Sequence, residues 1–423
     1  LYKMRAQEMN VFERLVFPNG SRIPNRIAKA AMEENMADLN HAPSEGLMRL
    51  YQAWADGGVG LIITGNVMVD RRAMTGPGGV VLEDEKYLDT FKRWAQIGRS
   101  KGAQVWLQIN HPGRQMQSNL GQQTWAPSAV ALDLGKLSDR FSLPIEMTQE
   151  MIEEVIQRFA NTARLGEKAG FNGVEIHAAH GYLLSQFLSP LSNQRQDQWG
   201  GSAENRMRFL LEIYKAVRAA TSAQFIISVK LNSADFQRGG ISEEDVIATF
   251  KAIDAAGIDL IEISGGSYEA PAMAGVKQEK RKASTIAREA YFLEFAEKIR
   301  EQVQCKLMVT GGFRTAAGMN AALESGACDF IGMARPFAVE PDVTNRLIAG
   351  QDVRYAVNKI KTGISMIDKM AIMEVIWYAA QFKDIAEGKQ PNPKLSPLKV
   401  FFNYLKGNVK AVIKGQVNSR KSA

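Results

Sequence analysis

The chain has 423 residues, of which 45% are hydrophobic and 23% charged, as in an ordinary globular protein with a substantial core. No run of about 18 apolar residues is present, so we expect no membrane-spanning helix. The two cysteines, Cys305 and Cys328, lie far apart in the sequence, which argues against a disulfide framework and predicts a reducing, cytoplasmic location.

The net charge of +7 is unevenly distributed along the chain. From Gly388 onward the chain carries eight basic and no acidic residues, whereas the part before it is close to neutral. The high isoelectric point is therefore a property of the C-terminal tail. We expect no nucleic-acid-binding surface on the body of the protein.

Short apolar runs of β-forming residues alternate with longer helical patterns. This alternation, with strands apolar on both faces, predicts an α/β fold of the (β/α)8 TIM-barrel type. An open doubly wound sheet is the alternative, and it ranks lower because no Gly-x-Gly-x-x-Gly follows a strand near the start. The predicted strands are Ile27–Met32, Gly60–Thr64, Gln104–Gln108, Gly173–Ile176, Phe225–Lys230, Leu260–Ser264, Leu307–Thr310 and Phe330–Met333.

Helices are predicted between these strands, and four of them have a serine or threonine suited to cap the first turn. The long insert 110–147 is expected to form part of a lid over the C-terminal face of the barrel. We divide the chain into a barrel over 1–350, a C-terminal helical segment over 351–387 and a basic tail over 388–423. The predicted helices cover 44–56, 84–100, 149–169, 202–219, 242–256, 287–303 and 315–325, with Ser44, Thr148, Ser202 and Ser242 as N-caps.

Polar residues follow the strands where the strands end, and in a barrel these ends meet at one rim. The fourth strand runs into His177, His180 and Tyr182. Imidazole N–H groups can polarise a carbonyl oxygen, and a phenol with a pKa of about 10 stays protonated at neutral pH and can deliver a proton. Two alternatives stay open: side chains satisfied within a loop network, or a zinc site, which ranks lower because it needs a third ligand.

This segment continues into a second motif, Asp-x-Trp-Gly-Gly-Ser-x-Glu-Asn-Arg, over residues 197–206. The two motifs together resemble the signature of the old yellow enzyme family, the NADH:flavin oxidoreductases and FMN-dependent ene reductases. The resemblance covers residues 11–350 and extends to the N-terminal barrel of 2,4-dienoyl-CoA reductase. This chain lacks the cysteine-rich iron–sulfur motif of those longer relatives. Electrons are therefore expected to pass directly from NADH or NADPH to FMN.

The resemblance implies a role for each strand end. His177 and His180 would hold a substrate carbonyl oxygen, and Tyr182 would be the proton donor. The FMN contacts would come from the first-strand run Ala31, Met32 and Glu33, from Asn66 through its backbone, from Gln108 and Lys230 at the pyrimidine edge, and from Gly311, Gly312, Ala334 and Arg335 at the phosphate. No metal is expected.

Three of these positions depart from the usual family pattern. Glu33 stands where relatives have Cys or Thr, and an ionised carboxylate beside the flavin would make reduction harder. Lys230 replaces the more common Arg and acts as a point charge, with a buried ion pair as the alternative interpretation. Ala334 replaces a Gly but keeps its backbone N–H. The pair Gly311-Gly312 also suits a tight turn without any ligand.

We predict an FMN-dependent oxidoreductase that uses NAD(P)H to reduce the activated C=C bond of α,β-unsaturated carbonyl compounds. A flavin-dependent dehydrogenase of an amine or alcohol, and a flavin-binding scaffold acting through the basic tail, are the alternatives. The expected partners are a small-molecule substrate and, with less support, a sister subunit. Residues 398–414 mix aromatics with lysines, which suits either peripheral contact with an anionic membrane or a solvated tail.

Overall fold

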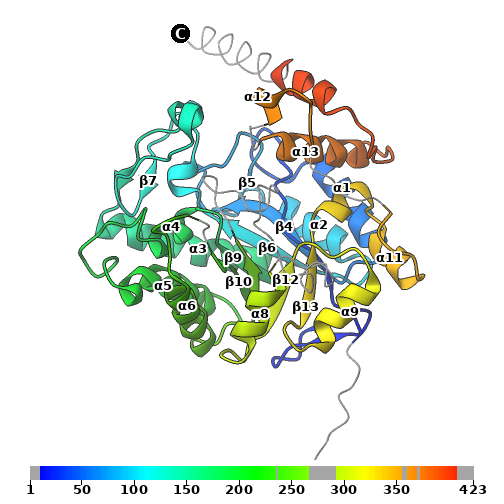
Figure 1. Cartoon of the computed structure of the whole chain (residues 1–423), viewed down its shortest axis with the longest axis horizontal. Coiled ribbons are helices and arrows are strands. Elements are labelled where there is room, and N and C mark those ends of the chain that lie inside the picture. The colour runs from blue at the N-terminus through cyan, green and yellow to red at the C-terminus, as the bar shows by residue number, and fades with distance from the viewer. Residues whose placement is uncertain (1–9, 235–236, 266–291, 355–359, 369–371, 407–423) are drawn as a thin grey trace, which may run out of the picture.

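The computed structural model describes residues 10–234, 237–265, 292–354, 360–368 and 372–406. Within these residues eight parallel strands close into a barrel, because the last strand pairs with the first (Figure 1). The predicted TIM barrel and its eight strands are confirmed. In barrel order the strands are β3 (Ile27–Lys29), β4 (Leu61–Met68), β6 (Gln104–Asn110), β9 (Gly173–Ala178), β10 (Ile226–Asn232), β11 (Leu260–Ser264), β12 (Lys306–Thr310) and β13 (Phe330–Met333), and the short β5 (Val80–Val81) extends β4.

The outer helices match the predicted segments, and all four predicted caps form. The side-chain oxygen of Ser44 accepts from the N–H of Leu47 at 3.1 Å, and Thr148, Ser202 and Ser242 cap their helices in the same way. The predicted helix 287–303 begins outside the described residues. The helices are α1 (Glu45–Asp56), α2 (Leu88–Arg99), α3 (Gln149–Lys168), α4 (Leu183–Leu188), α5 (Ala203–Ala220), α6 (Glu243–Ala255), α8 (Leu293–Arg300), α9 (Ala316–Glu324), α10 (Arg335–Val339) and α11 (Val343–Ile348).

The barrel interior changes character from one end to the other. At the N-terminal end it is apolar, and the hairpin of β1 (Leu15–Val16) and β2 (Arg22–Ile23) closes it with Phe17 packed edge-on against Trp106. Further along the strands the buried side chains become charged and polar. Because side chains alternate along a strand, Glu175 and His177 on β9 share one face of that strand. The polar end is the C-terminal mouth, where TIM barrels carry their active sites.

The insert 110–147 packs at the C-terminal end of the barrel. It contains three 3₁₀ turns and a small parallel sheet of β7 (Trp125–Ala126) and β8 (Ile145–Glu146), and β7 contacts α4. Gln115 donates from Nε2 to the backbone oxygen of His180 at 3.1 Å. The insert therefore borders the loop that carries the candidate catalytic residues.

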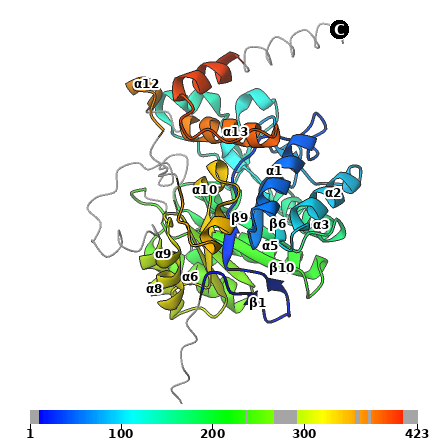
Figure 2. The same cartoon turned by 90° about the vertical axis from the view of Figure 1, so that its right-hand side faces the viewer.

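The segment after the barrel folds against it. α12 (Ser365–Asp368) is short, and α13 (Ile372–Ala386) packs on α1 and α10 at the opposite end from the β1–β2 hairpin (Figure 2). Trp377 donates to the backbone oxygen of Leu395 at 2.9 Å, so the first part of the basic tail lies back along α13. Residues 397–406 continue as a helix, and the rest of the predicted tail lies outside the described residues.

Candidate active site

The loop after β9 brings the three candidate catalytic side chains together. The His177 ring lies edge-on to those of His180 and Tyr182, with centroid distances of 5.1 and 4.8 Å. Tyr182 precedes the first residue of α4 and is 5% exposed. The spacing His-x-x-His-x-Tyr therefore gives a compact group of two imidazoles and one phenol.

Hydrogen bonds fix which nitrogen of His177 can serve a ligand. Its Nδ1 accepts from the backbone N–H of Ala179 at 3.3 Å, so the ring proton belongs on Nε2. Burial lowers the pKa of His177 well below its usual value, and nearby His180 and Lys230 lower it further. His177 is therefore a neutral N–H donor at physiological pH, the form that can hold a carbonyl oxygen without protonating it.

His180 is held in an unusual backbone conformation. Its φ of +60° lies in the left-handed region that non-glycine residues seldom adopt, and Gly181 follows with a φ of +75°. The backbone N–H of His180 donates to the Asn232 side chain at 3.3 Å, and its Nε2 lies 2.7 Å from the Ser264 hydroxyl. Burial lowers its pKa to about 3. Because Ser264 satisfies Nε2, a hydrogen bond to a substrate has to come from Nδ1–H.

Gln108 and Lys230 meet through a shared carboxylate. Gln108 donates from Nε2 to Glu175 Oε1 at 2.7 Å, and the Lys230 Nζ lies 3.8 Å from the same oxygen and 3.1 Å from Glu262 Oε1. The structure thus brings together the two residues predicted at the pyrimidine edge. It also shows the buried ion pair that was the alternative interpretation of Lys230. β10 continues to Asn232, so Lys230 lies within the strand and not at its end.

The last two strands end in the predicted phosphate-binding residues. Gly311 and Gly312 have φ values of +105° and +90°, which only glycine adopts readily. The N–H of Gly311 donates to the Gly332 oxygen at 3.1 Å, which joins this turn to β13. Ala334 and Arg335 directly follow β13, and Arg335 is the first residue of α10. Backbone N–H groups and a guanidinium at adjacent strand ends are a donor set suited to a phosphate.

The first-strand residues lie in a loop, because β3 ends at Lys29 and not at Met32. Ala31, Met32 and Glu33 are half-buried. The Glu33 carboxylate accepts from the Thr75 hydroxyl at 3.0 Å, and burial raises its pKa.

Orphaned polar atoms at the mouth indicate a polar ligand. Among the described residues, Asn66 Oδ1 and both amide atoms of the fully buried Asn110 have no hydrogen-bond partner. Asn66 lies inside β4, not after it, and pairs in register with Gln108. Buried polar atoms are normally satisfied. A flavin ring with a phosphate tail fits this set of groups. The set comprises the unpartnered amide atoms of Asn66 and Asn110, the amide of Gln108, the ammonium of Lys230, and the turn of Gly311 and Gly312.

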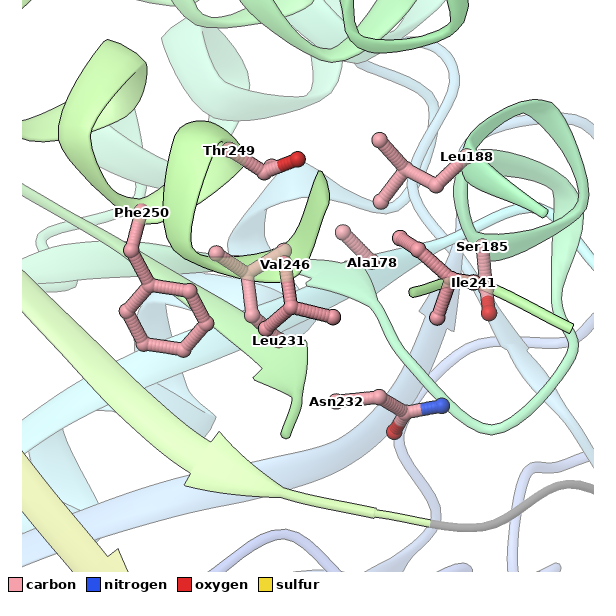
Figure 3. A pocket seen from close by; sticks show the side chains of 9 residues that line it. All are labelled: Ala178, Ser185, Leu188, Leu231, Asn232, Ile241, Val246, Thr249 and Phe250. Atoms are coloured by element: carbon pink, nitrogen blue, oxygen red, sulfur yellow. The ribbon is translucent and has the colours of Figure 1, made fainter. Parts of the chain in front are cut away.

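Two hollows in the described part of the chain are lined by none of the predicted site residues. One, of about 10 Å³, is lined by residues of β9, α4, β10 and α6 such as Ser185 and Asn232, and has room for about one water molecule (Figure 3). The other, of about 610 Å³, is lined by Gln104 and other residues near the N-terminal end of β6. Neither is suited to the reaction, by size in the first case and by position in the second.

The second sequence motif supports the histidine loop. Asn205 donates from Nδ2 to the Gly200 oxygen at 3.0 Å, and Arg206 donates from Nε to the Leu188 oxygen at 3.0 Å. These bonds tie α5 to the segment that follows α4. The motif therefore has a structural role, because it fixes the start of α5 against the loop that carries the histidines.

Sequence reasoning missed the acids inside the barrel. Glu175 and Glu262 are fully buried, and Ser264 contacts His180. A signal existed, since Val-Glu-Ile (174–176) and Ile-Glu-Ile (261–263) each place an acid in an apolar strand. A charged residue there has to be paired or neutral. No cluster of His, Cys, Asp or Glu suited to a metal occurs among the residues described.

Comparisons with known proteins agree with this geometry. NADH-dependent flavin oxidoreductase iliE of Neonectria sp. is 39% identical over 343 residues, which cover 76% of this chain and 45% of that protein. NADH-dependent flavin oxidoreductase iccE of Talaromyces variabilis is 38% identical over 352 residues, or 79% of this chain and 85% of that protein. This chain therefore spans less than half of the first relative and most of the second.

Solved structures show the same barrel. An old yellow enzyme homologue from Zymomonas mobilis superposes with a TM-score of 0.70 at 26% identity, covering 82% of this chain and 95% of that one. A 2-naphthoyl-CoA reductase superposes with a TM-score of 0.74 at 27% identity, covering 81% of this chain and 53% of that one. The family model described as NADH:flavin oxidoreductase / NADH oxidase matches residues 10–353. The chain therefore belongs to this family, which confirms the family, the flavin-dependent oxidoreductase class, and the FMN and NAD(P)H cofactors expected from the sequence.

Proposed function

We propose that the protein reduces the activated C=C bond of α,β-unsaturated carbonyl compounds with NAD(P)H. The observation that carries this proposal is the grouping of His177, His180 and Tyr182 at the barrel mouth, with His177 buried, His180 half-buried and the pKa values of both histidines lowered. Neutral imidazoles donate to an oxygen that gains negative charge, and a phenol supplies the proton. That combination suits conjugate reduction.

FMN, when bound, would take a hydride from NAD(P)H and deliver it to the β-carbon of the substrate. His177 Nε2–H and His180 Nδ1–H would hold the carbonyl oxygen and stabilise the enolate charge. Tyr182 would then give its phenolic proton to the α-carbon. Gln108 and Lys230 would face the pyrimidine edge, and Gly311, Gly312, Ala334 and Arg335 would hold the phosphate. Ala31, Met32, Glu33 and the Asn66 backbone would border the ring.

An anaerobic titration tests the proposal. The visible absorbance of the purified, flavin-loaded protein should bleach with NADH or NADPH and return when cyclohexenone is added. A flavin that bleaches but ignores the enone would favour the amine or alcohol dehydrogenase. A protein that binds FMN but is not bleached by NADH or NADPH would favour the flavin-binding scaffold, and a protein that binds no FMN would contradict the proposed enzyme.

Replacing Tyr182 with Phe should separate the two half-reactions. Loss of a general acid typically slows the step it serves by about 100- to 10,000-fold, so reoxidation by the enone should slow while bleaching by NAD(P)H stays nearly unchanged. Stopped-flow absorbance measures both rates. Tyr214→Phe is the matched control, because Tyr214 is a buried tyrosine on α5 outside the barrel. Equal reoxidation rates in both variants would remove Tyr182 from the mechanism.

We also propose a cytoplasmic location and a division into barrel, helical segment and tail. The thiols of Cys305 and Cys328 are free, which suits a reducing compartment. None of the helices in the described residues is both long and apolar enough to cross a membrane.

Phe402 and Leu405 are exposed beside Lys399 and Lys406, which supports peripheral contact with anionic lipids or a sister subunit. Vesicle sedimentation and sedimentation velocity of the full chain would test these two partners.

A further inference from the structure

Three neighbouring strands place a lysine between two glutamates inside the barrel. Lys230 on β10 pairs in register with Glu262 on β11, and Glu175 lies on β9 at the other side. The Lys230 Nζ is 3.1 Å from Glu262 Oε1 and 3.8 Å from Glu175 Oε1. Both acids are completely buried and Lys230 is 4% exposed. One ammonium therefore faces two carboxyl groups at a place that water does not reach.

Such a cluster cannot hold two ionised carboxylates. One would balance the lysine, and the second would be a buried charge without a counter-ion, which proteins avoid by protonation. Burial and the nearby Glu262 raise the pKa of Glu175 well above its usual value. For Glu262 burial works in the same direction, but Lys230 and Glu175 outweigh it and lower the pKa. Both acids together raise the pKa of Lys230 against its own burial.

Other charged or titratable groups near the cluster do not change this balance. Lys29 on β3 is occupied by Glu34. His177 on β9 and His180 in the loop that follows it are neutral, because burial lowers the pKa values of both. Gln108 on β6 donates to Glu175 and carries no charge. The lysine, the two acids and one proton are thus electrically neutral together.

We propose that Glu175 and Glu262 are positioning residues that share one proton, so that Lys230 keeps a fixed positive charge beside Gln108. One part of this proposal rests on the proposed function: the positive charge of Lys230 would lie at the edge of the flavin that gains negative charge on reduction. Either acid can be the ionised partner when the other is removed. This shared proton keeps the Lys230 ammonium charged over a wide pH range.

This sharing predicts a non-additive mutant cycle. In Glu262→Gln, Glu175 gives up its proton and balances Lys230, and in Glu175→Gln, Glu262 does so alone. Each single variant therefore keeps one carboxylate and one ammonium. The double variant leaves Lys230 buried without a counter-ion and should be far less stable than the sum of the singles. Adding Lys230→Met to the double variant removes the uncompensated charge and should restore stability.

The test uses the full chain without added flavin. Infrared spectra at neutral pH should show a protonated carboxyl in the wild type that is lost in both single variants, and urea unfolding should give midpoints for the singles, the double and the triple variant. Glu153→Gln, an exposed acid on α3, is the matched control and should leave both readouts unchanged. A carboxyl band that survives in either single variant would overturn the proposal. So would a double variant as stable as the singles. If the double variant does not fold, a folded triple variant supports the proposal and an unfolded one overturns it.

A second readout tests the link to the flavin. The FMN dissociation constants of the wild type and singles should be nearly flat from pH 6 to 9. In the double variant Lys230 loses its proton in this range, so binding should weaken by at least about tenfold towards pH 9. A flat profile in the double variant, with the infrared and unfolding results as expected, would keep the shared proton and overturn the contact between Lys230 and the flavin.

Discussion

Two buried lysines in this barrel lie in contrasting surroundings. Lys29 on β3 has one carboxylate partner, Glu34, at 3.3 Å, and its ammonium lies 4.4 Å from the centre of the Trp54 ring. Lys230 on β10 has two carboxylates, Glu175 and Glu262. Burial lowers the pKa of Lys29 to about 8 although Glu34 opposes the shift, whereas the two acids raise the pKa of Lys230 against its burial.

The difference follows from where the two side chains lie. Lys29 sits between the barrel wall and α1, among Tyr51 and Trp54, and it donates to the Ile63 backbone oxygen at 2.8 Å. Lys230 lies in the polar layer near the mouth, beside Gln108. A single carboxylate suffices where the lysine only holds a loop to the wall. In our proposal, the second carboxylate and the shared proton secure the positive charge that Lys230 would offer to the flavin.

The largest expected loss of stability is at Lys29, whose carboxylate partner is Glu34. Glu34→Gln leaves Lys29 buried without a carboxylate among the described residues, which should lower the free energy of unfolding by about 3–5 kcal/mol. Glu262→Gln leaves Glu175 as a partner and should cost less than about 1.5 kcal/mol. Urea unfolding of the two variants at pH 7 measures the contrast. Equal losses in both variants would mean that the number of carboxylates does not set the cost.

Much of the fold could be predicted from the sequence, because its signals are local. Apolar runs of four to eight residues gave the barrel strands, and Ser44, Thr148, Ser202 and Ser242 marked helix starts that the structure confirms. The histidine loop could be placed because three chemical groups follow one strand within six residues.

The partners of these residues could not be predicted in the same way. Glu175 and Glu262 are 87 positions apart in sequence and meet at Lys230 only because β9, β10 and β11 are neighbours in the closed barrel. Glu34 reaches back to Lys29 through a loop whose path no local pattern fixes. The predicted strand Phe225–Lys230 also ends too early, because the ladder of β10 with β11 continues to Asn232.

The second expected effect is a dependence of stability on pH that has opposite signs at the two lysine sites. With a folded pKa of about 8 and an unfolded value near 10.5, the unfolded chain holds a proton between these pH values that the folded chain has lost. Unfolding then takes up a proton, so the free energy of unfolding rises with pH in this window, by up to about 1.4 kcal/mol per pH unit. Below pH 8 both states are protonated and the contribution is constant.

Urea unfolding from pH 7 to 10 checks this slope. The double variant Lys29→Met/Glu34→Gln removes both charges and should lack the Lys29 contribution, so the difference from the wild type should open above pH 8. Lys230 keeps its proton throughout this range, because its pKa is raised. The cluster around Lys230 also holds the proposed shared proton, which the glutamates of the unfolded chain have lost in this pH range. A triple variant with Lys230→Met, Glu175→Gln and Glu262→Gln should therefore gain stability relative to the wild type as the pH rises, whereas the Lys29 double variant should lose it. Differences from the wild type with the same sign in both variants would contradict this contrast.

The smallest expected effect concerns the hydroxyl that completes the Lys29 site. Tyr51 donates to Glu34 Oε1 at 2.8 Å, and the same oxygen accepts from Lys29 at 3.3 Å and from the Gly65 N–H at 3.2 Å. Tyr51→Phe removes one of three donors and leaves the ion pair, so the free energy of unfolding should fall by about 1.5 kcal/mol.

Tyr378→Phe is the matched control, because the buried Tyr378 hydroxyl has no hydrogen-bond partner in the described part of the chain and its removal should be nearly neutral. A loss in Tyr51→Phe as large as that in Glu34→Gln would show that the hydroxyl, and not the ammonium, holds the carboxylate in place. The single carboxylate would then be a partner of Tyr51 first, and the contrast with Lys230 would rest on hydrogen bonding and not on charge.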